Sequence, residues 1–501
     1  MLKKIINIFL IIVFTVILFG CDSSSEMKIS EGLKYNLLSN DTYELVGIGT
    51  CKDEILNIPE VYNGKKVTKI GDNAFSINKT ITEVYIPDSV VEIGDYSFKA
   101  CQQLKIIVIP DSVVAIGESA FIDTVIEEIK LPKGLEVINN NTFESCNYLK
   151  KVELGESIKS IGNNAFYGCH QLEEINIPNT VTSIGDLAFY STAIKNINLP
   201  STLEYIGSGS FMECGYLKEA IIPEKITEIN DRLFELCTSL EKVIIPNNVT
   251  IIGKNAFKGC NRLQEIIIPD GVTKIDDCCF ANCGLITVID LPESLQFIGD
   301  QAFVNCGQLR SIVIPGNVTY LGEEAFSNCI RLGVAEIRGN IGSIKEKTFY
   351  KCNNLVAIIL PETIVSIGQS AFEECVKLID IVIPDNVYSI EINAFSDCES
   401  LSTVKLSKNI TIIPSGLFSG CVSLKNISLN NKVTEIQAGA FSSCVSLESI
   451  IIPKSVKVIR ANAFDSCDNI TFYCEAPMIQ DDWNQNWRPL NSKVVWNYVL
   501  E

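Results

Sequence analysis

The chain contains few of the residues that most catalytic and metal-binding sites use. Among 501 residues there is a single histidine, His170, with only four methionines and three tryptophans. Histidine is the usual proton carrier near neutral pH and a frequent zinc ligand, so its scarcity argues against both chemistries. No Gly-x-Ser-x-Gly, His-Glu-x-x-His or phosphate-binding glycine loop occurs in a suitable context. The sequence therefore predicts a protein that is not an enzyme and carries no metal or other cofactor.

Positive charge is also in short supply. There are 41 lysines and arginines against 60 aspartates and glutamates, which gives a net charge of −19. A strongly acidic chain is a poor partner for nucleic acids and for anionic lipid surfaces. Hydrophobic residues, by contrast, make up 47% of the chain, enough for an extensive core.

The N-terminus has the pattern of an export signal. Lys3 and Lys4 precede an almost unbroken apolar run, residues 5–19, which is shorter than the roughly 20 residues of a membrane span. The run ends at Gly20-Cys21, which resembles the lipobox of bacterial lipoproteins. That resemblance implies a signal peptide over 1–20, a lipid on Cys21 and a polar tether over 21–29, so that only this lipid touches the membrane. The alternative is an ordinary secretory signal that happens to have a cysteine nearby.

A repeat of 22–23 residues fills most of the chain. Its marker is a phenylalanine, and the spacing is 23 residues at all intervals except two of 22, which gives 18 copies: Phe75, Phe98, Phe121, Phe143, Phe166, Phe189, Phe211, Phe234, Phe257, Phe280, Phe303, Phe326, Phe349, Phe372, Phe395, Phe418, Phe441 and Phe464. Chance cannot hold this register over about 400 residues, so each copy is one coil of a solenoid.

Each copy also has a readable internal pattern. In the copy at 104–121, Leu-x-x-Ile-x-Ile ends in the alternation of a short strand, and Pro110 then stops it. Val113 and Ile116 point inward around a corner. Gly117 then begins what we expect to be a short helical turn ending in Ala-Phe. Asn139, Asn230 and Asp276 replace this glycine in other copies and would act as helix N-caps, whereas Glu391, Gln437 and Arg460 argue against a strict need for positive φ.

The string Ile-Pro-x-x-Val-x-x-Ile-Gly-x-x-Ala-Phe-x-x-Cys-x-x-Leu stands complete at 245–263. It resembles the BspA-like, Treponema-type branch of the leucine-rich repeats. The resemblance implies an α/β repeat solenoid over residues 67–467. It would be a right-handed superhelix with a parallel β-sheet on its concave side and short helical or 3-10 turns on its convex side. It also implies a bacterial surface protein that acts in adhesion.

Two caps close the expected solenoid. Residues 30–66 contain two alternating stretches with Ser39-Asn40-Asp41 between them, which predicts a hairpin. Residues 468–501 hold all three tryptophans, Trp483, Trp487 and Trp496, as expected of a segment that covers the last coil.

Twenty cysteines need their own explanation. Fifteen lie three residues after a repeat phenylalanine: Cys101, Cys146, Cys169, Cys214, Cys237, Cys260, Cys283, Cys306, Cys329, Cys352, Cys375, Cys398, Cys421, Cys444 and Cys467. Three interpretations stay open: a ladder of buried thiols facing backbone carbonyls, disulfides between adjacent coils, or a metal site. Parallel side chains suit a cross-link poorly, and ligands in line cannot surround zinc. Cys51 and Cys474, in the caps, are expected to be the most exposed.

The residue before the last isoleucine of each strand should face outward. This column is polar from Lys130 to Asn198, continues with three consecutive isoleucines and is mixed after them. Its ligand-face candidates are Ile221, Ile244, Ile267, Val313, Ile359 and Val382. The apolar residues are explained either by β-propensity alone or by an apolar stripe that binds an extracellular or host protein on the concave face. The sequence thus predicts a lipid-anchored recognition protein of the bacterial cell envelope, exposed at the cell surface. The alternative is an architectural envelope protein without a specific ligand.

Overall fold

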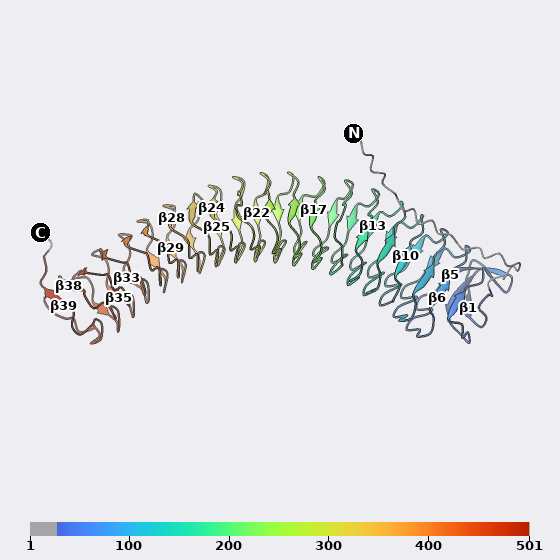
Figure 1. Cartoon of the computed structure of the whole chain (residues 1–501), viewed down its shortest axis with the longest axis horizontal. Helices are drawn as coiled ribbons and strands as arrows, with labels where there is room; N and C mark the ends of the chain where they lie inside the picture. Colours follow the sequence, from blue (N-terminus) through green and yellow to red (C-terminus); the bar gives the residue numbers. More distant parts are fainter. Residues whose placement is uncertain (1–27, 500–501) are drawn as a thin grey trace, which may run out of the picture.

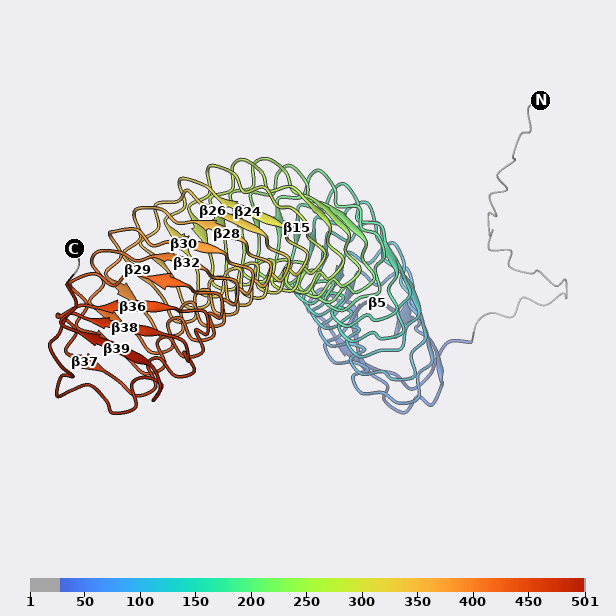
Figure 2. The same ribbon diagram turned by 60° about the vertical axis from the view of Figure 1, so that its left-hand side comes forward.

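The computed structural model describes residues 28–499, so the predicted signal peptide and Cys21 lie outside the described residues. Coils stack one on the next into a long curved rod (Figure 1), and the turned view shows the same arc (Figure 2). Within the described residues the structure consists of short strands and turns, and no helix is present. In this part of the chain there is accordingly no helix that could span a membrane.

Most coils contribute to a first row of strands, in the Leu-x-x-Ile-x-Ile segment. Neighbouring strands pair in parallel, for example Lys151 with Glu174. The members are β3 (Ile55–Asn57), β6 (Glu83–Tyr85), β8 (Ile106–Val108), β10 (Glu128–Lys130), β12 (Lys151–Glu153), β14 (Glu174–Ile175), β17 (Glu219–Ile221), β19 (Lys242–Ile244), β21 (Glu265–Ile266), β24 (Ser311–Ile314), β26 (Val334–Ile337), β28 (Ala357–Ile359), β30 (Asp380–Val382), β32 (Thr403–Lys405), β34 (Asn426–Ile427) and β36 (Ser449–Ile452).

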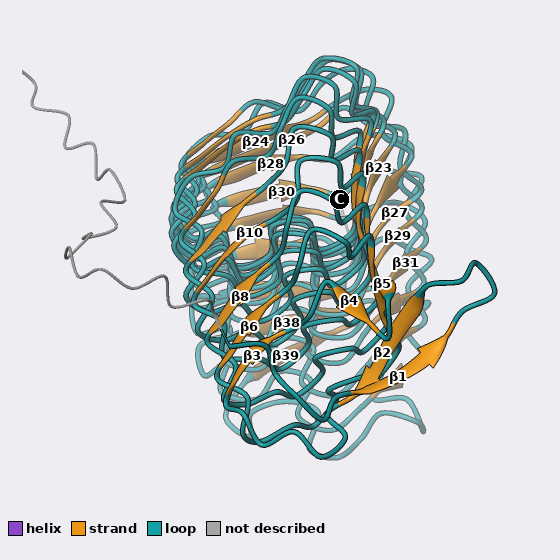
Figure 3. Ribbon diagram, turned by 90° about the vertical axis from the view of Figure 1, so that its right-hand side faces the viewer, coloured by secondary structure: helices purple, strands orange, loops and turns teal. Residues whose placement is uncertain are grey.

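A second row of short strands, mostly of two residues, follows the turn after each first-row segment, where the sequence pointed only to an inward corner. The members are β5 (Lys65–Ile70), β7 (Glu92–Ile93), β9 (Ala115–Ile116), β11 (Val137–Ile138), β13 (Ser160–Ile161), β15 (Ser183–Ile184), β16 (Tyr205–Ile206), β18 (Glu228–Ile229), β20 (Ile251–Ile252), β22 (Lys274–Ile275), β23 (Phe297–Ile298), β25 (Tyr320–Leu321), β27 (Ser343–Ile344), β29 (Ser366–Ile367), β31 (Ser389–Ile390), β33 (Ile412–Ile413), β35 (Glu435–Ile436) and β37 (Val458–Ile459). Seen from one end, the two rows line opposite flanks of the rod (Figure 3).

The predicted helical turn before each phenylalanine is wrong. In its place the chain forms successive turns with two left-handed residues per coil, for example Tyr96 at φ 55° and Ala100 at φ 53°. Between them, alternate N–H groups bond to the next coil, as from Phe98 to the carbonyl of Ala120 at 2.8 Å. A helix needs every residue right-handed and every bond within its own turn. Bonding to neighbouring coils therefore replaces helix formation.

The N-cap interpretation is wrong with it. Asn139 Nδ2 donates to the carbonyl of Ile116 in the preceding coil at 2.6 Å, and Asn230 Nδ2 donates likewise to Ile206 at 2.5 Å. The glycine that they replace has no positive φ at Gly117; it is required by crowding, because a Cβ there would lie 2.5 Å from the backbone nitrogen of Asp95. Polar residues at this corner thus join coils together.

Phenylalanines form the centre of the core. Each repeat phenylalanine stacks on the next, from Phe75 to Phe464, with ring centroids 4.9–5.9 Å apart. All are buried, and the inward leucines, isoleucines and valines of both strand rows complete one continuous core. The regular recurrence of phenylalanine is thus explained by a ring stack to which each coil contributes one ring.

The two ends of the stack are covered by different structures. At the start, β1 (Lys34–Leu37) pairs antiparallel with β2 (Tyr43–Gly47), the two stretches in which the sequence predicts a hairpin, and β4 (Val61–Tyr62) pairs antiparallel with β5. At the end, β38 (Thr471–Cys474) and β39 (Lys493–Trp496) extend the first row. Trp487 is buried against Phe464, the last ring of the stack, with centroids 5.9 Å apart.

Candidate functional site

The outward side of the first row, which we call the first-row face, contains the residues that the sequence selects as ligand-face candidates. Strand residues alternate between buried and exposed, so that Val243 lies in the core while Lys242 and Ile244 face outward. All six candidates are exposed: Ile221, Ile244, Ile267, Val313, Ile359 and Val382. The side-chain register read from the sequence therefore agrees with the structure.

Three of the candidates form a continuous group, the isoleucine stripe, defined as Ile221, Ile244 and Ile267. Ile221 and Ile244 are direct register partners, and Ile267 follows at the end of the next strand, with 83% of its surface exposed. A shallow hollow of about 410 Å³ lies beside Ile221 and Ile244. Charged residues border the stripe, where Lys242 Nζ lies 3.9 Å from a carboxylate oxygen of Glu265.

Of the other three candidates, only Ile359 and Val382 lie on adjacent coils. Glu336 lies between Val313 and Ile359 in the ladder and is held by two hydrogen bonds from Arg338, of 2.8 and 2.9 Å. Val382 belongs to the next sheet segment, which starts at β30. The apolar surface is therefore concentrated at the isoleucine stripe.

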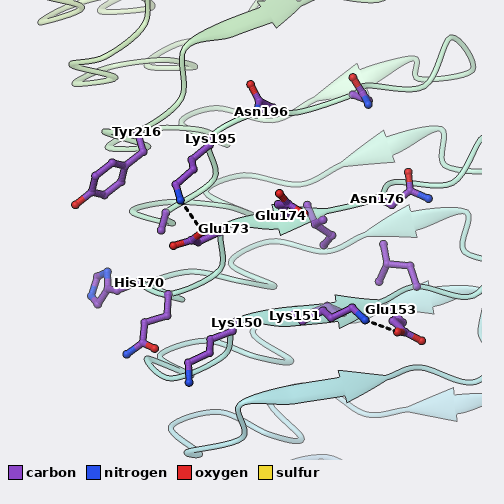
Figure 4. Close-up of a pocket in the computed structure, with 16 residues that line it drawn as sticks. Lys150, Lys151, Glu153, His170, Glu173, Glu174, Asn176, Lys195, Asn196 and Tyr216 are labelled. Carbon is purple, nitrogen blue, oxygen red and sulfur yellow. Dashed lines mark hydrogen bonds and ion pairs between the residues drawn. The ribbon is translucent and has the colours of Figure 1, made fainter. Parts of the chain in front are cut away.

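A larger hollow, which we call the polar hollow, adjoins the stripe on its N-terminal side. It has a volume of about 1130 Å³ and lies over β12, β14 and the following coil, at 193–198 (Figure 4). Its floor is made by two outward columns of the first-row face, which supply Lys151, Glu174 and Asn196 in one column and Glu153, Asn176 and Asn198 in the other. Sequence reasoning noted this polar stretch but missed it as a site.

The hollow has a local cause in the chain. The coil of Phe189 is one residue short, because Thr192-Ala193-Ile194 replaces the usual Cys-x-x-Leu corner. Small, buried Ala193 thus stands between the corners that carry His170 and Tyr216. The same coil contributes no first-row strand, and the first-row sheet is interrupted between β14 and β17. The hollow thus lies where a shortened coil and an interruption of the first-row sheet coincide.

Ion pairs fix several side chains around the hollow. Lys195 Nζ donates to Glu173 at 2.6 Å and Lys151 Nζ to Glu153 at 2.7 Å, as the dashed lines of Figure 4 show. Lys150 Nζ donates to Glu127 outside the hollow at 2.7 Å. The hydrogen bond from Lys151 lowers the pKa of the Glu153 carboxyl below its ordinary value. These charges are exposed and mutually compensated, which is unlike an acid–base pair tuned for catalysis.

His170, the only histidine, lies on the rim of the polar hollow. Its Nδ1 is 2.8 Å from the carbonyl oxygen of Ser191, in the next coil. The thiol of adjacent Cys169 is turned into the core, where it donates to the carbonyl of Phe143 at 3.2 Å. The two neighbours thus form no nucleophile–base pair.

The fifteen repeat cysteines are buried free thiols. Each Sγ donates to the carbonyl oxygen of the phenylalanine in the preceding coil over 3.0–3.3 Å. Burial raises the pKa of Cys101, Cys306 and Cys352 to about 12. This geometry matches the first of the three interpretations, a ladder of buried thiols. Residues 28–499 contain no cluster of three or more acidic, histidine or cysteine side chains suited to hold a metal ion.

Two expectations about exposed cysteines meet different outcomes. Cys51 is partly exposed, whereas Cys474 is buried within β38, where burial raises the pKa of its thiol to about 12. The prediction that Cys474 is exposed is wrong, because the C-terminal cap itself extends the sheet. Cys278, which the sequence did not single out, is partly exposed.

A family model described as "BspA type Leucine rich repeat region (6 copies)" matches residues 68–190, 136–261, 227–356 and 342–471. These overlapping ranges cover far more than half of the chain. The chain belongs to the BspA-type leucine-rich-repeat family. It is therefore a bacterial leucine-rich-repeat scaffold, as the resemblance in the sequence implied. Among curated protein sequences, none matches the chain.

One solved structure supports the same fold. A leucine-rich-repeat protein from Bacteroides ovatus is 27% identical, with a TM-score of 0.57, and the match covers 89% of this chain and 99% of that one. A leucine-rich cell surface protein from Faecalibacterium prausnitzii is 23% identical, with a TM-score of 0.28, over 89% of this chain and 93% of that one.

Proposed function

We propose that this protein is a surface recognition scaffold, not an enzyme, and that it binds a protein partner through the isoleucine stripe. The observation that carries the proposal is the contiguity of Ile221, Ile244 and Ile267 on successive coils. Their exposed fractions are 60%, 46% and 83%. An apolar centre with a charged border is the usual anatomy of a protein interface. Soluble proteins seldom leave such a surface uncovered without a use.

The size of the stripe limits the affinity that it supplies alone. Burial of exposed apolar side chains contributes about 25 cal/mol per Å², so three isoleucines supply several kcal/mol before association costs are subtracted. Specific interfaces are larger, so the partner must also touch the charged border of the stripe. Leucine-rich-repeat scaffolds generally act in protein recognition, which agrees with this choice.

The location is part of the proposal. The charged start, short apolar run and Gly20-Cys21 favour export and lipidation at Cys21, followed by display on the bacterial surface and adhesion to host or neighbouring cells. Cys21→Ala should release the protein from membranes and abolish incorporation of labelled fatty acid. Unchanged labelling would remove the lipid anchor from the proposal. The remaining alternative is an architectural envelope protein, which should show self-association without saturable binding.

The test of the stripe uses Ile244→Asp and a matched control. Val108 occupies the same column of the first-row face and has 47% of its surface exposed, but Tyr85 and Lys130 flank it instead of isoleucines. Purified protein is screened for saturable binding to immobilised matrix and mucosal proteins. Ile244→Asp should weaken binding at least tenfold and Val108→Asp should leave it unchanged. If both variants bind normally, the exposed isoleucines reflect β-propensity alone and the binding surface lies elsewhere.

A further inference from the structure

We propose that the polar hollow binds an uncharged carbohydrate chain, at a site separate from the isoleucine stripe. The inference is independent of the protein-binding role proposed above. It rests on four features of the hollow: unpartnered amides, a gap in the backbone ladder, balanced charge and an aromatic rim.

Three asparagine amides face the hollow without side-chain hydrogen bonds of their own. Asn176, Asn196 and Asn198 are exposed on neighbouring coils, and none of them donates or accepts a side-chain bond within residues 28–499. Elsewhere on the rod, asparagines commonly bond between coils, as Asn305 Nδ2 does to Asn282 at 2.8 Å. An amide offers one acceptor and two donors in a plane, which matches pairs of adjacent sugar hydroxyls.

The backbone beneath these amides is also unpaired. The N–H and C=O groups of residues 196–198 make no backbone hydrogen bond within the described chain, although the flanking residue Lys195 donates to Glu173 at 3.2 Å. In the other coils this segment forms a strand paired with at least one neighbour, except in the coil at 288–291, which also lacks the strand. Exposed donors and acceptors in the floor add to the hydrogen-bonding capacity that a polyhydroxyl ligand requires.

Charge in the hollow favours a neutral ligand. Lys150, Lys151 and Lys195 contribute three positive charges, and Glu153, Glu173 and Glu174 contribute three negative charges, so the sum is zero. Most of these groups are already engaged in ion pairs. An anionic ligand would have to break an ion pair to reach a lysine. A charged ligand of either sign would also meet charge of its own sign, whereas hydroxyl groups bond to both members of a pair.

The rim of the hollow carries an exposed aromatic ring. Tyr216 and His170 stand on either side of the small Ala193, and Tyr216 has 62% of its surface exposed. An exposed ring beside hydrogen-bonding groups suits a sugar, which presents C–H groups on its faces and hydroxyls on its edges. Neighbouring coils are about 4.8 Å apart, close to the length of one hexose unit, so consecutive sugars meet consecutive coils.

The experiment titrates the purified protein with cellohexaose, laminarihexaose, maltohexaose and mannohexaose, by calorimetry and by saturation-transfer NMR. At least one hexaose should bind saturably. The affinity should change little between low and high salt, because no net charge is neutralised. Sulfated heparin hexasaccharide and cationic chitosan hexaose should bind more weakly.

Variants place the binding on the hollow. Asn196→Ala with Asn198→Ala should lower the affinity about tenfold or more, because two amides lose their hydrogen bonds to the sugar. The matched control is Asn426→Ala with Ser428→Ala, which changes the same two columns in a distant coil and should have no effect. Tyr216→Ala should also weaken binding. Circular dichroism melting confirms that each variant is folded.

Three results would overturn the assignment. They are no saturable binding of any hexaose at millimolar concentration, equal losses in the Asn196/Asn198 variant and in its control, and preferred binding of a charged oligosaccharide. A protein partner whose binding depends on Asn196 and Asn198, with no sugar bound, would also overturn it.

Discussion

The inside and the outside of this solenoid follow opposite rules. In the core, every coil presents a phenylalanine to the ring stack, and fifteen coils add a cysteine that bonds to the phenylalanine carbonyl before it. On the first-row face, adjacent coils present Lys, Glu, Asn or Ile at the same position. The residue types are fixed where coils touch each other and are free where they touch solvent.

Stacking explains this difference. A buried side chain in a solenoid must fit the identical position of two neighbours, so one departure disturbs two contacts. An outward side chain meets only its row neighbours and water. Both proposed binding sites therefore use outward positions: the isoleucine stripe lies on regular coils, and the polar hollow lies over a shortened one.

The largest expected effect is a loss of stability in alkali. Burial raises the pKa of most repeat thiols, to about 11 for Cys146 and Cys214 and to about 12 for Cys101, Cys306 and Cys352. An unfolded thiol titrates near 8.5. The folded state thus holds more protons above that pH, so stability is complete below about pH 8.5 and is lost as the pH rises towards the folded values. Each thiol contributes about 1.4 kcal/mol per pH unit.

Urea unfolding followed by circular dichroism at pH 7 and pH 10, with reductant present, measures this loss. Many thiols act together, so the midpoint should fall steeply at pH 10 and recover on return to pH 7. An unchanged midpoint would mean that the thiols are not buried as protonated groups. Burial of the thiols would then not explain why cysteine recurs in the core while residue types vary on the first-row face.

The second effect concerns one ring of the stack. Phe257→Ala removes a buried ring that stacks on Phe234 and Phe280 at 5.7 and 5.4 Å. Loss of a large buried side chain and the remaining cavity should reduce the free energy of unfolding by about 3–5 kcal/mol. Chemical denaturation of the variant measures the loss, and limited proteolysis should cut first near residue 257. A loss below about 1 kcal/mol would show that neighbouring coils close the gap.

Much of this fold could be predicted from the sequence, because a strict spacing translates directly into stacked coils. The strand before Pro110 and the buried positions of Val113 and Ile116 follow from local pattern. The turns before Phe121 could not be predicted in the same way. Ser119 adopts φ 53°, and its segment bonds to the next coil, as from Phe121 to the carbonyl of Thr142 at 3.0 Å. Such bonds depend on a neighbour 21 residues away and leave no helical or strand period.

The candidate sites divide in the same manner. Exposure of Ile244 follows from the alternation of inward and outward residues along a strand, which is visible in the sequence. The polar hollow depends on a deletion near Ala193, on a missing strand and on the rim formed by His170 and Tyr216. The deletion is visible in the 22-residue spacing between Phe189 and Phe211. The depth of the hollow, however, arises only when three coils lie side by side. The signal in the sequence is the irregular copy, and a search for such copies would have pointed to the hollow.

A smaller effect is expected from the thiol ladder. Cys260 donates to the carbonyl of Phe234 at 3.2 Å and is fully buried. Cys260→Ala removes that bond and leaves a small void, and the expected cost is about 1–2 kcal/mol by urea denaturation. Cys260→Thr is the informative companion, because Thr124 and Thr192 occupy this position in the two shortened coils. If threonine proves as stable as cysteine in a full-length coil, the thiol is not specifically required there.

The smallest effect is expected on the first-row face. Ile267 has 83% of its surface exposed and follows the end of β21, so Ile267→Ser removes little burial and no strand pairing. The free energy of unfolding should change by no more than about 0.5 kcal/mol, as is usual for surface positions without special contacts. Urea denaturation of Ile267→Ser and of Cys260→Ala, which lie in the same region of the solenoid, compares the loss of unfolding free energy at an outward and at an inward position. If Ile267→Ser costs as much as Cys260→Ala, the face contributes to the stability of the stack. The exposed isoleucines would then be explained by their contribution to folding. Residue types at the outward positions would not be free to vary, and both proposed binding sites depend on that freedom.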